Sequence, residues 1–216
     1  MTLTAELSAM FARSAKRLSP ETKAAFARAA EEFARQKVGE TALGIGDLLP
    51  DAIMLTVNGD EKSIRSFLEN GPLIISFYRG GWCPYCNLEL KAYQKILPEI
   101  AQAGGTFVAV SPEKPDRSLS TAQKNELSFP VLTDQNLALS KALGIAFEYT
   151  EDLIKTYKGF ELFLDEIHAG GGWALPVPAT YVIGTDGRII LAHVERNYET
   201  RLEPTDALKA LISKTQ

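Results

Sequence analysis

Arg79-Gly80-Gly81-Trp82-Cys83-Pro84-Tyr85-Cys86 lies where this 216-residue chain changes from a strand-like to a helix-like pattern of apolar residues. It follows an apolar run at residues 73–78 and precedes a stretch in which apolar residues recur three or four positions apart. An apolar run, two glycines and such a stretch predict a buried strand, a tight turn and a helix. We therefore expect both cysteines in the first turn of that helix.

This position predicts different roles for the two thiols. The first turn of a helix presents unpaired N–H groups and the positive end of the helix dipole, and both stabilise a thiolate. Pro84 suits the first helical position, and the two-residue spacing brings Cys86 within disulfide reach of Cys83. We expect an acidic, exposed Cys83 that attacks the substrate and a more buried Cys86 that resolves the product.

Two alternatives for the pair are half of a zinc site and two inert core thiols. Zinc needs two further ligands, and the only histidines, His168 and His193, show no matching spacing. Neither histidine has a neighbour pattern that indicates a catalytic triad. We therefore predict no metal and no cofactor. Because the chain has no other cysteine, any disulfide within it must join Cys83 to Cys86.

Composition predicts a globular protein with one full-sized domain and an appendage, since 45% of the residues are hydrophobic. The formal charge of −4 provides no basic surface for nucleic acid, and no apolar run is long enough to span a membrane. The first residues lack the basic and apolar segments of a secretory signal. We expect a cytoplasmic protein that binds neither nucleic acid nor membrane.

Residues 1–43 are predicted to form an N-terminal helical extension. Two amphipathic helical patterns occupy it, and Ser19-Pro20-Glu21 starts the second. We expect the extension to dock on the main domain or on a second subunit. Gly44-Ile45-Gly46-Asp47 then marks a boundary, so residues 44–216 are predicted to form the main domain.

The main domain alternates strand and helix signals, which predicts an α/β fold. A strand at 73–78, a helix at 85–102 and a strand at 106–110 form a β-α-β unit, which implies parallel pairing and a right-handed crossover. We expect a helical insertion at 148–168. Further along, a hairpin over 179–194 and a closing helix at 205–213 complete the pattern.

These residues resemble the thioredoxin-like superfamily, and more closely its redoxin group of alkyl hydroperoxide reductase and thiol-specific antioxidant proteins, the peroxiredoxin-like family. The resemblance covers about residues 44–214. It implies a thioredoxin-like fold with a central mixed β-sheet flanked by helices. It rests on Phe77-Tyr78 leading to Cys83-Pro84, Phe129-Pro130-Val131-Leu132-Thr133-Asp134, Ala138-Leu139-Ser140-Lys141-Ala142-Leu143-Gly144, and Thr180-Tyr181-Val182-Ile183-Gly184-Thr185-Asp186-Gly187-Arg188-Ile189.

The resemblance implies that Cys83 is the peroxidatic cysteine and that Pro178 follows a cis peptide bond facing the disulfide. The chain also departs from the family pattern. Gly80 stands where a Thr or Ser is usual, Ser76 where a Pro is usual, and Pro178 where an Arg is expected two residues before Thr180. In these respects the motif is closer to thioredoxins, and Cys-Pro-Tyr-Cys also resembles glutaredoxins.

Several neighbours of the cysteines are candidate supporting residues. Arg79 is predicted to stabilise the thiolate and to bind a peroxide or carboxylate oxygen, with an ordinary surface charge as the alternative. Trp82 and Trp173 could line the mouth of the site or simply pack, and Tyr85 is expected to point outward toward a partner. Glu89 is either a proton relay for Cys86 or a solvated helix charge.

The resemblance implies a thiol-dependent peroxidase that reduces hydrogen peroxide or alkyl hydroperoxides through a Cys83–Cys86 disulfide. A thioredoxin- or glutathione-type reductant would regenerate the pair, and the chain could assemble as a homodimer. One alternative is a thioredoxin- or glutaredoxin-like oxidoreductase that acts on a disulfide substrate. A second is a non-enzymatic redox sensor, which would be oxidised once without turnover.

Overall fold

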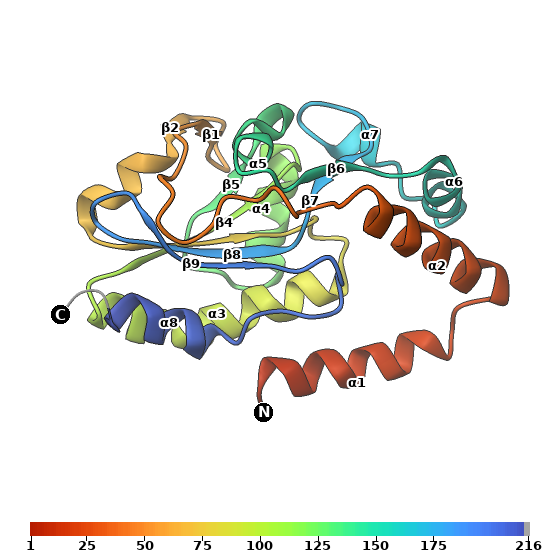
Figure 1. Cartoon of the computed structure of the whole chain (residues 1–216), viewed down its shortest axis with the longest axis horizontal. Coiled ribbons are helices and arrows are strands. Elements are labelled where there is room, and N and C mark those ends of the chain that lie inside the picture. Colours follow the sequence, from red (N-terminus) through yellow and green to blue (C-terminus); the bar gives the residue numbers. More distant parts are fainter. Residues whose placement is uncertain (214–216) are drawn as a thin grey trace.

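The computed structural model describes residues 1–213, which form a central sheet with helices on both faces (Figure 1). The strand order in the sheet is β2-β1-β5-β4-β3-β8-β9. The strands are β1 (Ile53–Leu55), β2 (Glu61–Ser63), β3 (Leu73–Phe77), β4 (Thr106–Ser111), β5 (Val131–Thr133), β8 (Ala179–Ile183) and β9 (Ile189–Val194). Strands β3, β4 and β5 are parallel, whereas β8 runs antiparallel to β3. The predicted α/β class with a central mixed sheet is confirmed.

Strand β3 separates two hydrophobic cores and delivers the chain to the cysteines. All its residues are buried, and successive side chains point to opposite faces. Ile75 and Phe77 belong to one core, while Ile74 and the following Tyr78 belong to the other. Burying one such side chain contributes roughly 1.5–3 kcal/mol of hydrophobic free energy. The start of the cysteine helix is therefore fixed by a strand that is packed on both faces.

Helices cover both cores. The face with Ile74 is covered by α3 (Pro84–Gln102) and α8 (Pro204–Ser213) (Figure 1). The opposite core includes residues of the 3₁₀ segment η1 (Ile64–Asn70) and of α5 (Ala138–Ala142), which a second 3₁₀ turn, η2 (Gln135–Leu137), precedes. Helix α4 (Pro115–Lys124) contacts β5. The strand–helix–strand unit predicted around the cysteines is present as β3, α3 and β4.

The N-terminal extension packs on the rest of the chain. Helix α1 (Leu3–Ala15) lies along α3, and the Glu203 carboxylate accepts hydrogen bonds from the backbone N–H groups of Leu3 and Thr4. Helix α2 (Pro20–Arg35) begins with its Ser19 cap and packs against α6 (Glu151–Gly159). The boundary between residues 43 and 44 stays a prediction.

The segment predicted as a helical insertion is more divided than its apolar spacing suggested. It contains the end of β6 (Ala146–Glu148), helix α6, and the short helix α7 (Leu164–Ile167). Glu161, with a φ of 58°, interrupts the helical path between α6 and α7. Strand β6 pairs with β7 (Ala174–Pro176) in a separate two-stranded sheet that the sequence analysis did not predict.

The cis peptide bond predicted before Pro178 is absent, because the Val177–Pro178 bond is trans. Val177 donates its N–H to the Ile145 carbonyl at 2.8 Å, directly after β7, and β8 begins at Ala179. The chain thus runs extended from one strand into the next. This part of the comparison with thioredoxins was wrong.

Candidate active site

Cys83 occupies the N-cap of α3, as its position in the motif predicted. Its backbone N–H donates to the Gly80 carbonyl at 3.1 Å, and Pro84 is the first residue of the helix. The turn before it needs glycines, because a Cβ on Gly81 would lie 2.0 Å from the Thr121 hydroxyl oxygen and Gly80 has a φ of +150°. The Gly-Gly pair therefore lets the backbone pass close to the Thr121 side chain and places Cys83 at the start of α3.

The two thiols form no disulfide, and both are fully buried. The prediction of an exposed Cys83 was therefore wrong. The Arg79 side chain, which was predicted to stabilise the thiolate, lies directly on the sulfur of Cys83. The sequence could not show that rings from α6 and from the segment after β9 enclose Arg79. A helix N-terminus that would be open in isolation is covered by parts of the chain that are distant in sequence.

The Arg79 guanidinium is the direct neighbour of the Cys83 sulfur. Its Nη2 donates to Cys83 Sγ at 3.3 Å, and its Nη1 donates to the phenol oxygens of Tyr149 and Tyr157 at 3.2 and 3.3 Å. The guanidinium carbon lies 4.3 Å from the ring centre of Tyr198 and 4.9 Å from that of Trp82. Burial raises the pKa of Tyr149 and of Tyr198, so these phenols stay uncharged at neutral pH. The positive charge of Arg79 is therefore available to the thiolate.

The environment makes Cys83 acidic. Burial alone would raise the pKa of the Cys83 thiol. A hydrogen bond with Cys86 and the charges of Arg79 and Arg201 outweigh burial, and the pKa lies well below its usual range. The lowered pKa favours the thiolate, which is the nucleophilic form of cysteine.

Cys86 also has a guanidinium neighbour, that of Arg201, but this guanidinium is already paired with a carboxylate. Arg201 Nη2 donates to Cys86 Sγ at 3.3 Å, while Arg201 Nε donates to the Glu89 carboxylate at 2.6 Å. The Ser76 hydroxyl donates to the same carboxylate at 3.1 Å. Burial and the neighbouring Cys83 thiolate raise the pKa of Cys86 well above its usual range. Cys86 therefore remains a neutral thiol.

Of the predicted supporting residues, Arg79 and Trp82 lie at the site. Arg79 is buried, so the alternative of an ordinary surface charge was wrong. Trp82 lies against Arg79 and makes an edge-to-face contact with Tyr157. Trp173 packs instead beside Lys158, whose Nζ is 5.5 Å from the ring centre.

Two other predicted neighbours face the interior. Tyr85 is buried against the ring of Tyr198, so the prediction that it points outward was wrong. Glu89 is fully buried in its ion pair with Arg201, which excludes a solvated helix charge.

Pro178 and Thr180, the other two predicted supporting residues, lie in different environments. Pro178 lines a cavity that also reaches Arg79. Thr180 is buried in β8, where it pairs with Ser76 of β3. Their assignment as supporting residues stays a prediction.

Sequence reasoning missed the residues that reach the site from far along the chain. Arg201 is 115 positions from Cys86 and precedes α8 in a segment without a recognisable motif. Tyr157 belonged to the apolar spacing of the predicted helical insertion, and no sequence pattern had singled out Tyr149 or Tyr198. No local signal in the sequence could have identified these contacts.

Glu113 is a further missed residue on the Cys83 side of the site. Its carboxylate accepts a hydrogen bond from the Gly81 N–H at 2.8 Å. Burial raises the pKa of Glu113 to about 7, and the Gly81 hydrogen bond and the Arg117 charge only partly offset this effect. Glu113 can therefore exchange a proton near neutral pH.

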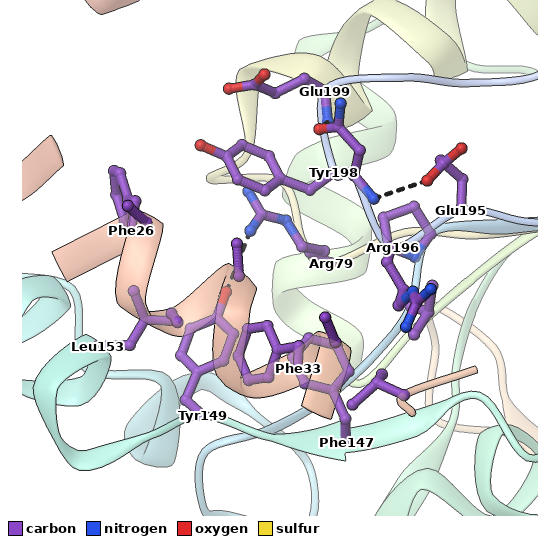
Figure 2. Close-up of a pocket in the computed structure, with 18 of the residues that line it drawn as sticks. Phe26, Phe33, Arg79, Phe147, Tyr149, Leu153, Glu195, Arg196, Tyr198 and Glu199 are labelled. Carbon is purple, nitrogen blue, oxygen red and sulfur yellow. Dashed lines mark hydrogen bonds between the residues drawn. The ribbon is translucent and has the colours of Figure 1, made fainter. Parts of the chain in front are cut away.

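A cavity of about 510 Å³ opens between α2, α6 and residues 195–199, with Arg79 in its wall. Figure 2 shows Phe33, Phe147 and Tyr149 on one side of Arg79 and Tyr198 on the other. Most of the lining is aromatic or aliphatic. The cavity is large enough for a small organic molecule, for which volumes of about 300–1,000 Å³ are usual.

The chain matches the family model described as the AhpC/TSA family over residues 45–192. Among curated proteins, it is 24% identical to peroxiredoxin Bcp of Escherichia coli over 129 residues, covering 60% of this chain and 81% of that protein. It is also 25% identical to the thiol-disulfide oxidoreductase ResA of Halalkalibacterium halodurans over 127 residues, covering 58% of this chain and 69% of ResA.

Solved structures share the architecture. Peroxidoxin BcpB from Mycobacterium tuberculosis superposes with a TM-score of 0.64 at 17% identity, covering 79% of this chain and 97% of BcpB. A PrxQ mutant from Xylella fastidiosa superposes with a TM-score of 0.62 at 19% identity, covering 81% of this chain and 98% of PrxQ. The predicted thioredoxin-like fold is confirmed.

Proposed function

The chain belongs to the AhpC/TSA family, and we propose that it is a thiol-dependent peroxidase that works through a Cys83–Cys86 disulfide. One observation carries the assignment of Cys83 as the attacking residue. Its sulfur, whose pKa lies well below the usual range, is 3.3 Å from a guanidinium group whose other hydrogen bonds go to two tyrosine phenols. Such a sulfur is prepared to attack an electrophilic oxygen, and the guanidinium is placed to stabilise the anion that leaves.

In the first step the Cys83 thiolate attacks one peroxide oxygen and the O–O bond breaks. A sulfenic acid forms on Cys83, and the other oxygen leaves as hydroxide or alkoxide, which takes a proton from water. In the second step the Cys86 sulfur attacks the sulfenic sulfur. The S–O bond breaks, the disulfide forms, and the hydroxyl group leaves with the Cys86 thiol proton as water.

A thiol reductant then completes the cycle. One thiolate attacks the disulfide and a mixed disulfide forms. The second thiol of the same dithiol, or a second molecule of a monothiol such as glutathione, then releases the reduced pair and leaves as the oxidised reductant. We propose a thioredoxin- or glutathione-type reductant in the cytoplasm. The confinement of both cysteines to this motif supports a reducing compartment. In residues 1–213 no helix has the length and apolar character needed to cross a membrane. A homodimer stays a prediction, and light scattering during gel filtration would check it.

A thiol–disulfide oxidoreductase is the second candidate. The Cys-x-x-Cys spacing, the similarity to ResA and the replacement of the usual Thr or Ser by Gly80 favour it. The same sulfur chemistry would then start on a disulfide sulfur instead of a peroxide oxygen. Comparing the rate of Cys83 sulfenate formation with peroxides against the rate of reduction of a model protein disulfide separates the two functions.

The variant Cys86→Ser tests the peroxidase mechanism. It should lose turnover with a dithiol reductant but still consume about one peroxide per chain, because the attacking thiolate remains. Mass spectrometry should find two added oxygens on Cys83 at peroxide concentrations that give only a disulfide in the parent. Cys83→Ser is the matched control and should consume no peroxide. Equal turnover of parent and Cys86→Ser would mean that an external thiol recycles Cys83 directly. Oxidation of the parent once, without turnover in excess reductant, would indicate the redox sensor instead.

A further inference from the structure

The Arg79 guanidinium has an incomplete set of partners. Its Nη1 donates to the phenols of Tyr149 and Tyr157, and its Nη2 donates to Cys83 Sγ. The buried Nε has no hydrogen-bond partner among residues 1–213, and no ion pair within these residues includes Arg79. Leaving a buried N–H unpaired costs free energy, which a ligand oxygen recovers when it accepts the hydrogen bond. The guanidinium therefore has room for one more acceptor.

Arg79 lies in the wall of the cavity of about 510 Å³, and most of the remaining wall is apolar. Figure 2 shows the guanidinium between the rings that line this space. Phe26 and Phe33 of α2 hold their places through ring contacts, Phe26 at 6.1 Å from Tyr157 and Phe33 at 4.7 Å from Phe147, measured between ring centres. A cationic group in an aromatic cavity is suited to a ligand with an apolar body and one anionic end.

The cavity comes largely from parts of the chain that the AhpC/TSA match does not include. That match covers residues 45–192, whereas helix α2 and residues 195–199 supply much of the lining. Two ion pairs connect these parts to their surroundings, Arg28 with Asp152 of α6 and Glu40 with Arg196. The cavity is therefore specific to the way this chain packs its N-terminal extension.

The other charged groups of the lining favour a ligand with a single negative charge. Arg196 is already paired with Glu40, at 3.4 Å. Glu195 and Glu199 are partly exposed, and Glu195 accepts a hydrogen bond from a backbone N–H at 2.9 Å. Their charges repel a dianion such as phosphate, and an apolar wall adds the cost of removing water from a second charge. A monocarboxylate meets both conditions.

The redox state of the cysteines changes the charge beside Arg79. In the reduced chain the lowered pKa of Cys83 favours a thiolate, to which Nη2 donates. When the Cys83–Cys86 disulfide forms, the pair gives two electrons to the oxidant and releases the Cys86 thiol proton, so the negative charge on Cys83 disappears. A carboxylate bound at Nε lies close to this sulfur, because one guanidinium group bonds both. The thiolate therefore repels the carboxylate, and the neutral disulfide does not.

We propose that the cavity binds an aromatic or branched aliphatic monocarboxylate, that Arg79 pairs with its carboxylate, and that the disulfide form binds it more tightly than the dithiol form. The inference rests on the Cys83–Cys86 disulfide of the proposed function but requires no peroxide chemistry. Ligand binding and redox state are then reciprocally linked. A tenfold preference for the disulfide form lowers the reduction potential of the pair by about 30 mV at saturating ligand, which opposes its reduction.

Calorimetric titration of the parent with 3-phenylpropionate tests the redox dependence. One sample is kept reduced, and the other is oxidised with diamide, with the disulfide verified by mass spectrometry. The Kd of the acid should be at least about tenfold lower for the oxidised sample. The neutral analogue 3-phenylpropionamide should show no such difference, because the thiolate does not repel it. No binding of the acid to the oxidised parent, or equal affinity for both forms, would overturn the proposal.

Two serine variants separate the charge on Cys83 from the other effects of oxidation. Under reducing conditions Cys83→Ser has no thiolate beside Arg79 and should bind the acid as tightly as the oxidised parent does. Cys86→Ser is the matched control, since it keeps Cys83 and should bind as weakly as the reduced parent. Equal affinity of the two variants would contradict the charge linkage. A parent that forms no disulfide would refute the proposed function separately, and this pair of variants would still test the linkage.

Three further variants locate the site. Ala30→Trp places an indole in the cavity and should weaken binding of the acid to the oxidised chain about tenfold or more. Ala24→Trp adds the same side chain at an exposed position of α2 outside the lining and should bind as the parent does. Arg79→Met should remove the preference for the acid over the amide. Unchanged affinity in folded Ala30→Trp would place the ligand elsewhere and overturn the assigned site.

Discussion

Cys83 and Cys86 each have a guanidinium nitrogen 3.3 Å from the sulfur, yet their pKa values move in opposite directions. Arg79, beside Cys83, is otherwise bound to neutral phenols and aromatic rings. Arg201, beside Cys86, is bound to the Glu89 carboxylate. Distance from an arginine therefore does not determine the acidity of a thiol here. Burial raises the pKa of both thiols, and the hydrogen bond between them lowers the pKa of Cys83 and raises that of Cys86.

The surroundings of Arg79 and Arg201 also differ. The Arg79 side of the site borders a cavity, whereas Arg201 and Glu89 are buried with Ser76 and two backbone carbonyls around them. A reactive sulfur needs available charge and space for a substrate. A resolving sulfur needs to stay neutral until the sulfenic acid forms. The two arginine environments supply these different conditions within one helical turn.

The largest effect is expected from Arg201→Met. Removing the guanidinium leaves the fully buried Glu89 without its ionic partner, which should cost about 3–5 kcal/mol of unfolding free energy at pH 7. Urea unfolding measures this loss. It should shrink as the pH falls, because an unpaired Glu89 can take up a proton, and the double variant Glu89→Gln/Arg201→Met should recover much of it. A loss below about 1 kcal/mol would show that the Glu89–Arg201 ion pair does not stabilise the fold appreciably.

Glu113 should produce a pH dependence because, unlike Glu89, it has no buried guanidinium partner. Its pKa of about 7 in the folded chain exceeds the usual value of about 4.3. The folded state thus binds the extra proton, and this residue's contribution to stability falls by roughly 3–4 kcal/mol at most as the pH rises from about 4 to above 7.

Glu113→Gln keeps an oxygen for the Gly81 N–H but cannot titrate. The difference in urea midpoint between this variant and the parent should therefore grow in favour of the variant from pH 5 to pH 8. A difference that does not change with pH would contradict the assigned pKa. Comparing the two proteins also cancels the opposite contribution of Cys83, whose lowered pKa raises stability with rising pH.

Arg79→Met should raise the pKa of Cys83 by roughly 1–2 units, because a charge-assisted hydrogen bond contributes about 1.5–3 kcal/mol. The pH dependence of alkylation by iodoacetamide, with mass spectrometry to locate the label, measures this shift. In the parent, Cys83 should be labelled before Cys86 near pH 6. Arg79→Lys should give an intermediate pKa, since a point charge replaces the fork of donors. Labelling of Cys86 first in the parent would reverse the assigned roles.

Tyr157→Phe should have the smallest effect. It removes one neutral acceptor of Arg79 and leaves Tyr149, so the expected loss of stability is about 0.5–1.5 kcal/mol. The alkylation pKa of Cys83 should stay within about half a unit of the parent, because the phenol contributes no charge. A larger pKa shift would mean that the phenols, and not the guanidinium charge alone, control the thiolate.

Local sequence was sufficient for the elements around the cysteines. Residues 73–78, the glycine pair and the apolar spacing after Cys86 predicted β3, the turn and α3, because each signal depends on interactions within a few residues. The hairpin of β8 and β9 and the closing helix α8 were predicted for the same reason. A lowered pKa of Cys83 was also predicted, from its place at a helix start, whereas in the structure the causes are the hydrogen bond with Cys86 and the charges of Arg79 and Arg201.

Only the tertiary structure determined which residues surround the two sulfurs. Arg201 reaches Cys86 across 115 positions, and the tyrosines of Arg79 come from α6, its preceding loop and the segment after β9. The burial of Cys83, the inward position of Tyr85 and the trans bond before Pro178 likewise depend on how distant segments pack. The sequence motif identified the chemical groups, but a charge becomes available or neutralised only through its neighbours in space, which no local pattern specifies.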